Sequence, residues 1–170
     1  MSGTLTYDQN LLDKFSKFTG ELQQELQGVF GYMSTALRYA VTIGDSAIRQ
    51  RIQGELNHAV GLFSVAHLMG RFEKVLPKAY WHEVVVDAND LERILAYRHI
   101  SLSGHKGFSG DRVNEDRASF DSVMAGPNPI LGVESFTTQK IVLTENFGIH
   151  AHQFLYPLSN MILAEIAKKI

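Results

Sequence analysis

The feature that most constrains this chain is a helical apolar pattern that runs without a proline through residues 7–43. Its apolar residues are spaced three or four apart, as on one face of a long α-helix: Leu11, Phe15, Phe18, Leu22, Leu26, Val29, Met33, Leu37 and Ala40. Residues 43–46 break the pattern and supply a new N-cap, and a second helical pattern then continues to about Phe72. Helices this long, joined this tightly, must lie antiparallel.

The remaining residues predict two further helices. Thr6 and Gln9 resemble a capping box at the start of the first helix, and residues 81–88 could be extended. A third, shorter helix begins at Asn89 or Asp90. Asn128-Pro129 forms an N-cap and N1 pair that begins a last helix, which runs to the C-terminus with a kink at Pro157. Residues 104–127 form a long connection with room for a short helix near residues 115–124. The predicted fold is all-α: a single antiparallel four-helix-bundle domain over residues 1–170, with a long crossover between helices three and four.

Composition excludes several classes of function. The 170 residues include 16 Lys+Arg against 18 Asp+Glu, so no basic footprint points to nucleic acid. The chain has no cysteine, which excludes disulfides, thiolate-bound zinc and thiol catalysis. No long uncharged apolar run predicts a membrane span, and the N-terminus lacks the apolar core of a signal peptide. A cytoplasmic location is the default expectation.

Several charged residues fall on helix faces that are otherwise apolar. Glu55 and His58 form an E-x-x-H pair on the inner face of the second helix, and Glu25 lies at the edge of the first stripe. If the last helix begins at Asn128, then Glu134, Glu145 and His152 share one direction on it. A buried carboxylate is costly unless it is paired, protonated or bound to metal. The third helix instead centres its inner stripe on Arg98, a guanidinium for which Glu55, Glu134 and Glu145 are available partners.

The segments ELQGVFGY, which contains Glu25, and GELNHAVGLF, which contains Glu55 and His58, resemble the ferritin-like superfamily of ferritins, bacterioferritins, rubrerythrins and manganese catalases. The resemblance covers about residues 8–72 and the general four-helix layout. It implies a carboxylate and histidine site for iron or manganese in the bundle core. The metal ligands would be Glu25, Glu55, His58 and Glu145, with His152 as a flexible or supporting ligand. In the second half, Arg98 stands at the helix-three carboxylate position, and Gly148 stands where the last E-x-x-H would have its histidine.

Two functions therefore stay open. One is a ferritin-like protein that binds iron or manganese in the bundle core, with O2 or peroxide activation, or iron oxidation, as its expected chemistry. The other is a non-catalytic bundle for binding or assembly, in which an Arg98–carboxylate network replaces the metal. The last helix also predicts a homodimer, because it carries a second apolar stripe: Phe136, Leu143, Phe147, Phe154, Leu158 and Met161. The alternative cover for this stripe is the connection within the chain, through Phe108, Phe120, Val123 and Met124.

Overall fold

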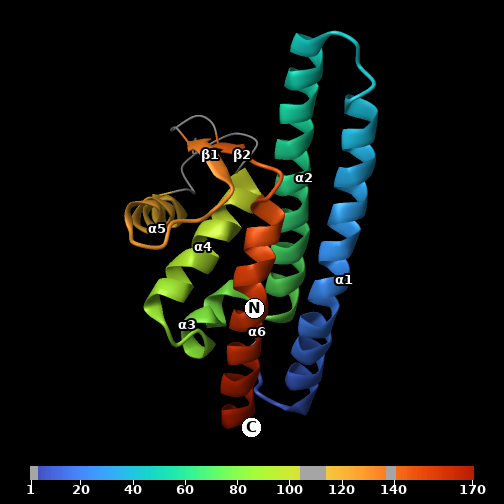
Figure 1. The fold of residues 1–170 in the computed structure, drawn as a ribbon. Coiled ribbons are helices and arrows are strands. Elements are labelled where there is room, and N and C mark those ends of the chain that lie inside the picture. Colours follow the sequence, from blue (N-terminus) through green and yellow to red (C-terminus); the bar gives the residue numbers. More distant parts are fainter. Residues whose placement is uncertain (1–3, 104–113, 137–140) are drawn as a thin grey trace.

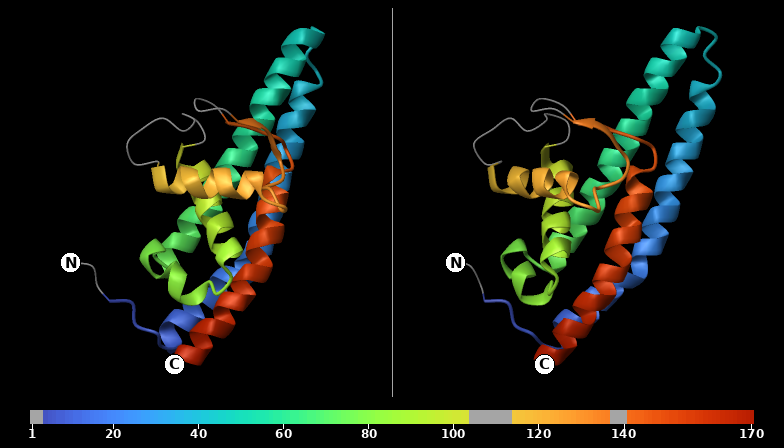
Figure 2. Two further views of the ribbon diagram at one scale, coloured as in Figure 1. Left: turned by 90° about the vertical axis from the view of Figure 1, so that its left-hand side faces the viewer. Right: turned by 60° about the vertical axis from the view of Figure 1, so that its left-hand side comes forward.

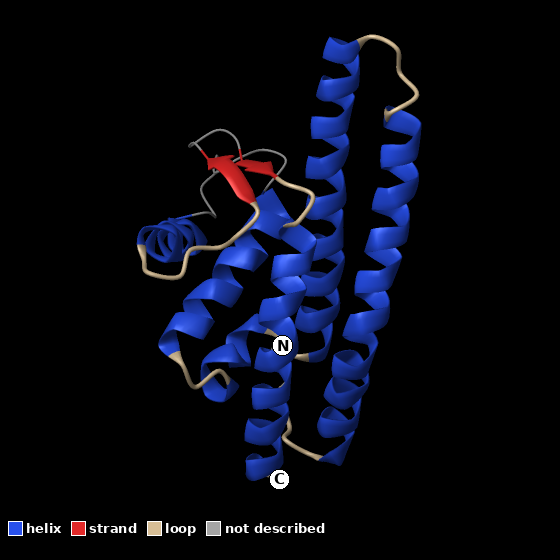
Figure 3. Cartoon of the chain, viewed as in Figure 1, coloured by secondary structure: helices blue, strands red, loops and turns tan. Residues whose placement is uncertain are grey.

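The chain folds into long helices with one small two-stranded sheet, as Figures 1 and 3 show. The structure, a computed structural model, describes residues 4–103, 114–136 and 141–170. The all-α prediction is confirmed at this coarse level. The elements are α1 Gln9–Ala40, α2 Ser46–Val75, the 3-10 helix η1 Lys78–Tyr80, α3 Trp81–Val84, α4 Ala88–Ser103, α5 Asn114–Ala125, β1 Val133–Phe136, β2 Ile141–Leu143 and α6 Phe147–Lys169.

Two aspartates cap the N-termini of the long helices. Asp45 Oδ1 accepts a hydrogen bond from the Ile48 backbone N–H at 3.0 Å, which confirms the predicted N-cap between the helices. At the start of α1, Asp8 Oδ1 accepts from the Leu11 N–H at 2.9 Å. The prediction of a Thr6–Gln9 capping box is therefore wrong, because Asp8 already satisfies the first turn.

The core lies along the first half of α1, the second half of α2, α4 and α6. The predicted stripe supplies Leu11, Phe15, Phe18 and Leu22, each at most 6% exposed. Ala40 is also buried, whereas the side chains of Leu26, Val29, Met33 and Leu37 lie outside the described part of the structure.

Phe72 is the centre of an aromatic cluster. Its ring centroid lies 5.7 Å from those of Phe15 and Phe18 and 5.1 Å from that of Trp81. Trp81 Nε1 donates to the Leu76 carbonyl at 2.7 Å. Residues 81–84 therefore form a helical turn, α3, where the sequence suggested an extended conformation for 81–88, whereas Val85 directly after it is extended.

The helices differ greatly in how far they extend. α6 packs against α1 and α2, α4 packs against α2, and α5 packs on α4. In Figure 1, α6 runs antiparallel to α1 and beside the lower half of the α1–α2 hairpin. Figure 2 shows that the upper half of this hairpin projects well beyond all the other elements. Among the described helices, none is both long and apolar enough to cross a membrane.

The prediction of one last helix from Asn128 to the C-terminus is wrong. Val133–Phe136 and Ile141–Leu143 form the antiparallel strands β1 and β2, and α6 begins only at Phe147. Gly132 is the reason for the break: its φ of +85° suits glycine, and a Cβ there would lie 2.6 Å from the Phe147 Cα. Because this part is not helical, Glu134, Glu145 and His152 do not share a helical face.

Most of the second apolar stripe is covered within the chain, while Phe136 and Met161 stay 41% and 50% exposed. Leu143, Phe147 and Leu158 are at most 3% exposed, and the Phe154 ring stacks on Tyr97 of α4 at 5.4 Å. Phe120 of α5 meets Phe136 edge-on at 5.1 Å. Phe120 and Val123 are buried and Met124 is partly buried against the core, as the alternative predicted, while Phe108 lies outside the described residues. Most of this stripe therefore packs within the chain, and the structure does not support the predicted homodimer through it.

Candidate functional site

A group of four charged or ionisable side chains joins α1 to α2 around Glu25. Glu25 and Glu21 both accept hydrogen bonds from the Arg71 guanidinium, and Glu25 Oε2 lies 2.9 Å from His67 Nε2. All but His67 are only about one quarter to one third exposed, at 26–31% of the side-chain surface. The hydrogen bond to Glu21 is the main reason that the pKa of Arg71 is raised. The guanidinium therefore stays charged and offsets one of the two negative charges of Glu21 and Glu25.

Glu55 lies on the outer surface of α2. Its side chain is 67% exposed, and Oε1 pairs with Arg51 Nε at 3.2 Å, one turn earlier on the same helix. A surface pair of this kind holds no buried charge and contributes little to stability. Glu55 does not face Glu25, because α1 and α2 pair at a different register.

His58 and Glu145 lie together at the corner where β2 leads into α6. His58 Nδ1 accepts the backbone N–H of Leu143 at 3.1 Å, and Asn57 Nδ2 donates to Glu145 Oε2 at 3.3 Å. Gly61 lets this corner approach, since a Cβ there would lie 3.2 Å from the Thr144 carbonyl oxygen. Residues 54–63 of α2, the segment on which the ferritin-like resemblance rests, therefore hold the end of strand β2 against the helix.

His152 is separate from the other predicted ligands. It is half-buried on α6, with its ring 6.0 Å from Tyr156 in a stacked arrangement. Its Nε2 atom is buried, and no hydrogen-bond partner for it appears among the described residues. Burial lowers the pKa of His152, so the ring is neutral at neutral pH.

Arg98 has a carboxylate partner, as the sequence predicted, but this partner is Glu73 and not one of the three expected glutamates. Its Nε and Nη2 donate to the two oxygens of Glu73 at 2.9 and 3.1 Å, which makes a bidentate pair between α4 and α2. Glu55, Glu134 and Glu145, the three expected partners, are elsewhere: Glu134 is exposed on β1. The expected class of interaction is correct, and the expected residues are wrong.

As placed, the five predicted ligands do not fit a dinuclear metal centre. Only His58 and Glu145 come to one corner, while Glu25, Glu55 and His152 occupy three other places. Across the described residues, no group of three or more histidine, aspartate or glutamate side chains is placed to hold a metal ion. Both carboxylate oxygens of Glu25, which would have to bind the metal, already contact Arg71 and His67.

The residues that the sequence interpretation missed are Glu21, His67, Arg71 and Glu73. A signal for three of them is present. Glu21 and Glu25 are four residues apart, as are His67 and Arg71, so each pair shares one helix face. Both contacts across the hairpin, Glu21 with Arg71 and Glu25 with His67, are centred on residue 46, next to the turn between the helices. Charges of opposite sign at matching distances from a turn predict such a pairing.

Comparison with known proteins identifies no relative of this chain. No protein-family model matches the chain, and no curated protein and no solved structure shows significant similarity to it.

Proposed function

We propose that this chain is a helical assembly protein that forms a homodimer through the projecting half of its α1–α2 hairpin. Ion pairs such as Arg71–Glu25 and Arg98–Glu73 join its helices where a ferritin-like protein would hold metal. The observation that carries the proposal is the composition of the projection on its α1 side and at its turn. Residues 26–44 contain a single charged side chain, Arg38.

Large apolar side chains are exposed on both helices of the projection and at its turn. Tyr39 is 73% exposed, Val41 61%, Ile48 52% and, nearer the base, Phe63 70%. A two-helix hairpin has no third helix to cover such residues, and contiguous apolar surface on a protein usually marks an interaction site.

Glycines inside the two helices support a close approach by another chain. Among the described atoms, none lies within 4 Å of a Cβ placed at Gly28, Gly31 or Gly54. Each glycine weakens a helix interior by about 1 kcal/mol relative to alanine, so packing within this chain does not account for them. A helix of another chain that packs directly against the backbone at these glycines would account for them.

A second copy is the partner that this surface fits best. Two antiparallel helices are half of a four-helix bundle, and two copies related by a twofold axis would complete it. Residues 26–44 offer a charged partner only Arg38, and the charges that follow on the α2 side, Asp45, Arg49, Arg51 and Glu55, are of both signs and sum to zero. A face about 22 Å long and two helices wide would bury roughly 1,200 Å² in total, at the lower end of the range for stable dimers.

Sedimentation equilibrium tests the proposal directly. The wild type should have twice the 19.0 kDa chain mass, and Ile48→Glu with Phe63→Glu should give a monomer with unchanged helical circular dichroism. The matched control is Tyr156→Glu with Met161→Glu, which places the same charges at apolar residues of α6 that are 45% and 50% exposed. A monomeric wild type at 50 µM would refute the proposal, as would dissociation by the control pair alone.

A further inference from the structure

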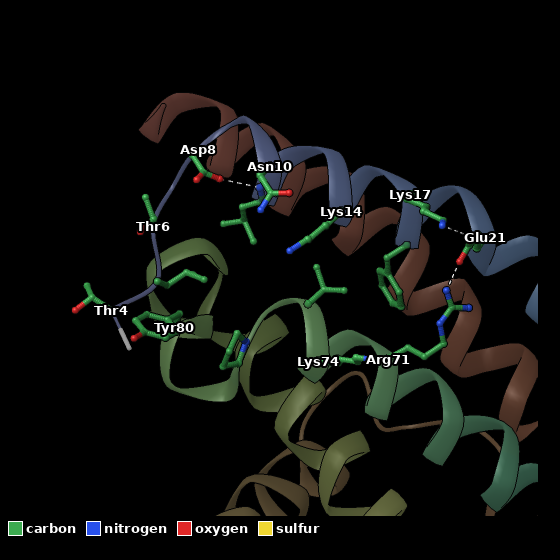
Figure 4. A pocket seen from close by; sticks show the side chains of 15 residues that line it. Thr4, Thr6, Asp8, Asn10, Lys14, Lys17, Glu21, Arg71, Lys74 and Tyr80 are labelled. Carbon is green, nitrogen blue, oxygen red and sulfur yellow. Dashed lines mark hydrogen bonds and ion pairs between the residues drawn. The ribbon is translucent and has the colours of Figure 1, made fainter. Parts of the chain in front are cut away.

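A groove of about 740 Å³ lies at the other end of the hairpin, far from the projection. It runs along the seam between the first half of α1 and the second half of α2, and residues 4–8 and η1 border one end of it (Figure 4). Phe18 and Val75 line its floor. The volume is in the range of sites that bind small molecules.

Cationic side chains gather on both walls of this groove. Lys14 and Lys17 come from α1, and Arg71 and Lys74 come from α2. Figure 4 shows Lys14 extending from α1 into the space between the two helices. The groove is thus basic in a chain whose formal net charge is −2.

The acidic residues at the groove are already engaged. Glu21 holds Arg71 and lies 3.9 Å from Lys17 Nζ, and Asp8 accepts the hydrogen bond that caps α1. Within the described ranges, neither Lys14 nor Lys74 has an acidic partner within 4.0 Å. Two ammonium groups on facing helices therefore lack a counter-charge.

We propose that this groove binds a small ligand that carries two phosphate groups, held between Lys14 and Lys74. An ammonium group binds phosphate as a point charge and does not need the bidentate geometry of arginine. The hydroxyls of Thr4 and Thr6 line the same groove and can donate to phosphate oxygens. Arg71 pairs with Glu21 and Glu25 of α1 and so links the two walls of the groove.

Isothermal titration calorimetry with the full chain tests this assignment, using inorganic pyrophosphate and a sugar bisphosphate as probes. One site per chain should saturate, and Lys14→Gln with Lys74→Gln should weaken binding by about tenfold or more, since charged hydrogen bonds are lost. The matched control is Arg38→Gln with Arg51→Gln, which removes the same charge from exposed positions on the hairpin.

The two probes separate the possible sources of the ligand. Tighter binding of the bisphosphate indicates a small organic molecule that uses the groove floor, and equal binding indicates inorganic phosphate chemistry; both support the site. Absence of saturable binding for both probes overturns it. An equal loss in the lysine and arginine double variants also overturns it, because attraction would then be unspecific. Dimer formation is measured separately, so either proposal can fail alone.

Discussion

The backbone N–H of Leu143 donates to Nδ1 of His58 across 3.1 Å, so a helix side chain takes a hydrogen bond from the β2 strand. A neutral imidazole that accepts at Nδ1 carries its proton on Nε2. The contact fixes the end of the β1–β2 pair against α2 just before α6 begins. This hydrogen bond gives His58, which the sequence analysis predicted to be a metal ligand, a structural role.

Replacing His58 should therefore reduce the stability of the protein. His58→Phe keeps a ring but leaves the Leu143 N–H without its acceptor, which should lower the free energy of unfolding by about 1–3 kcal/mol. Urea denaturation measures the loss. His82→Phe, at an exposed histidine, is the control and should change it by less than about 0.5 kcal/mol. Equal effects would show that the hydrogen bond contributes nothing particular.

The Arg71 pairs should matter more than the surface pair on the same helix. Arg71→Leu leaves Glu21 and Glu25 partly buried without their main counter-charge, so we expect a loss of about 1–3 kcal/mol. Arg51→Leu breaks a pair whose side chains are 81% and 67% exposed, and should cost no more than about 0.5 kcal/mol. Chemical denaturation of both variants gives the comparison, and a reversed order would contradict it.

Gly132 should not tolerate a side chain. Gly132→Ala places a Cβ 2.6 Å from the Phe147 Cα at a φ of +85°, so unfolding free energy should fall by at least about 2 kcal/mol. Gly70→Ala is the opposite case. It lies in α2 with nothing within 4 Å of the new Cβ, and should stabilise the protein by up to about 1 kcal/mol.

Acid should weaken the fold through His152. Because burial lowers its folded-state pKa below the ordinary 6.5, the unfolded chain takes up the proton first as pH falls. The stability that His152 contributes is complete above pH 6.5 and decreases as pH falls towards the folded-state pKa. Melting temperatures of the wild type and of His152→Phe should be measured between pH 8 and pH 5. As the pH falls, the melting temperature of the wild type should decrease more than that of the variant. Parallel curves would exclude this histidine as the cause.

Iron and manganese provide a test of the ferritin-like expectation. If Arg71 and the other pairs replace the metal, untagged protein should contain substoichiometric Fe and Mn by elemental analysis, and EDTA should leave Tm unchanged. A stoichiometric metal that EDTA removes with a fall in Tm would restore the metal site as the better explanation of Glu25 and His58.

The sequence predicts the long helices well, because their signals are local. The apolar period, the Asp45 cap and the short helix near residues 115–124 all appear in the structure. Local signals did not decide which residues face each other across the hairpin. Pairs centred on residue 46 place Glu25 beside His67, whereas pairing Glu25 with Glu55 would need a centre at residue 40, inside α1.

The sequence interpretation was least accurate where tertiary contacts override a helical pattern. Residues 133–143 contain β-branched side chains, yet their spacing also matched a helix that began at Asn128. The close approach of Gly132 to Phe147 and the acceptor on His58 settle the choice, and neither contact can be read from periodicity. Placing Glu134 and Glu145 on one helix followed directly from that error.

The unequal support along α1 has a consequence for local opening. The lower half of this 32-residue helix lies between α2 and α6, while the upper half has α2 alone beside it. In an isolated chain, amide protons in the upper half should exchange with solvent through fraying of the tip, with protection rising steadily towards Phe15. The hairpin would then behave as a stiff base with a loosely held end, and protection at that end would report directly on its occupancy.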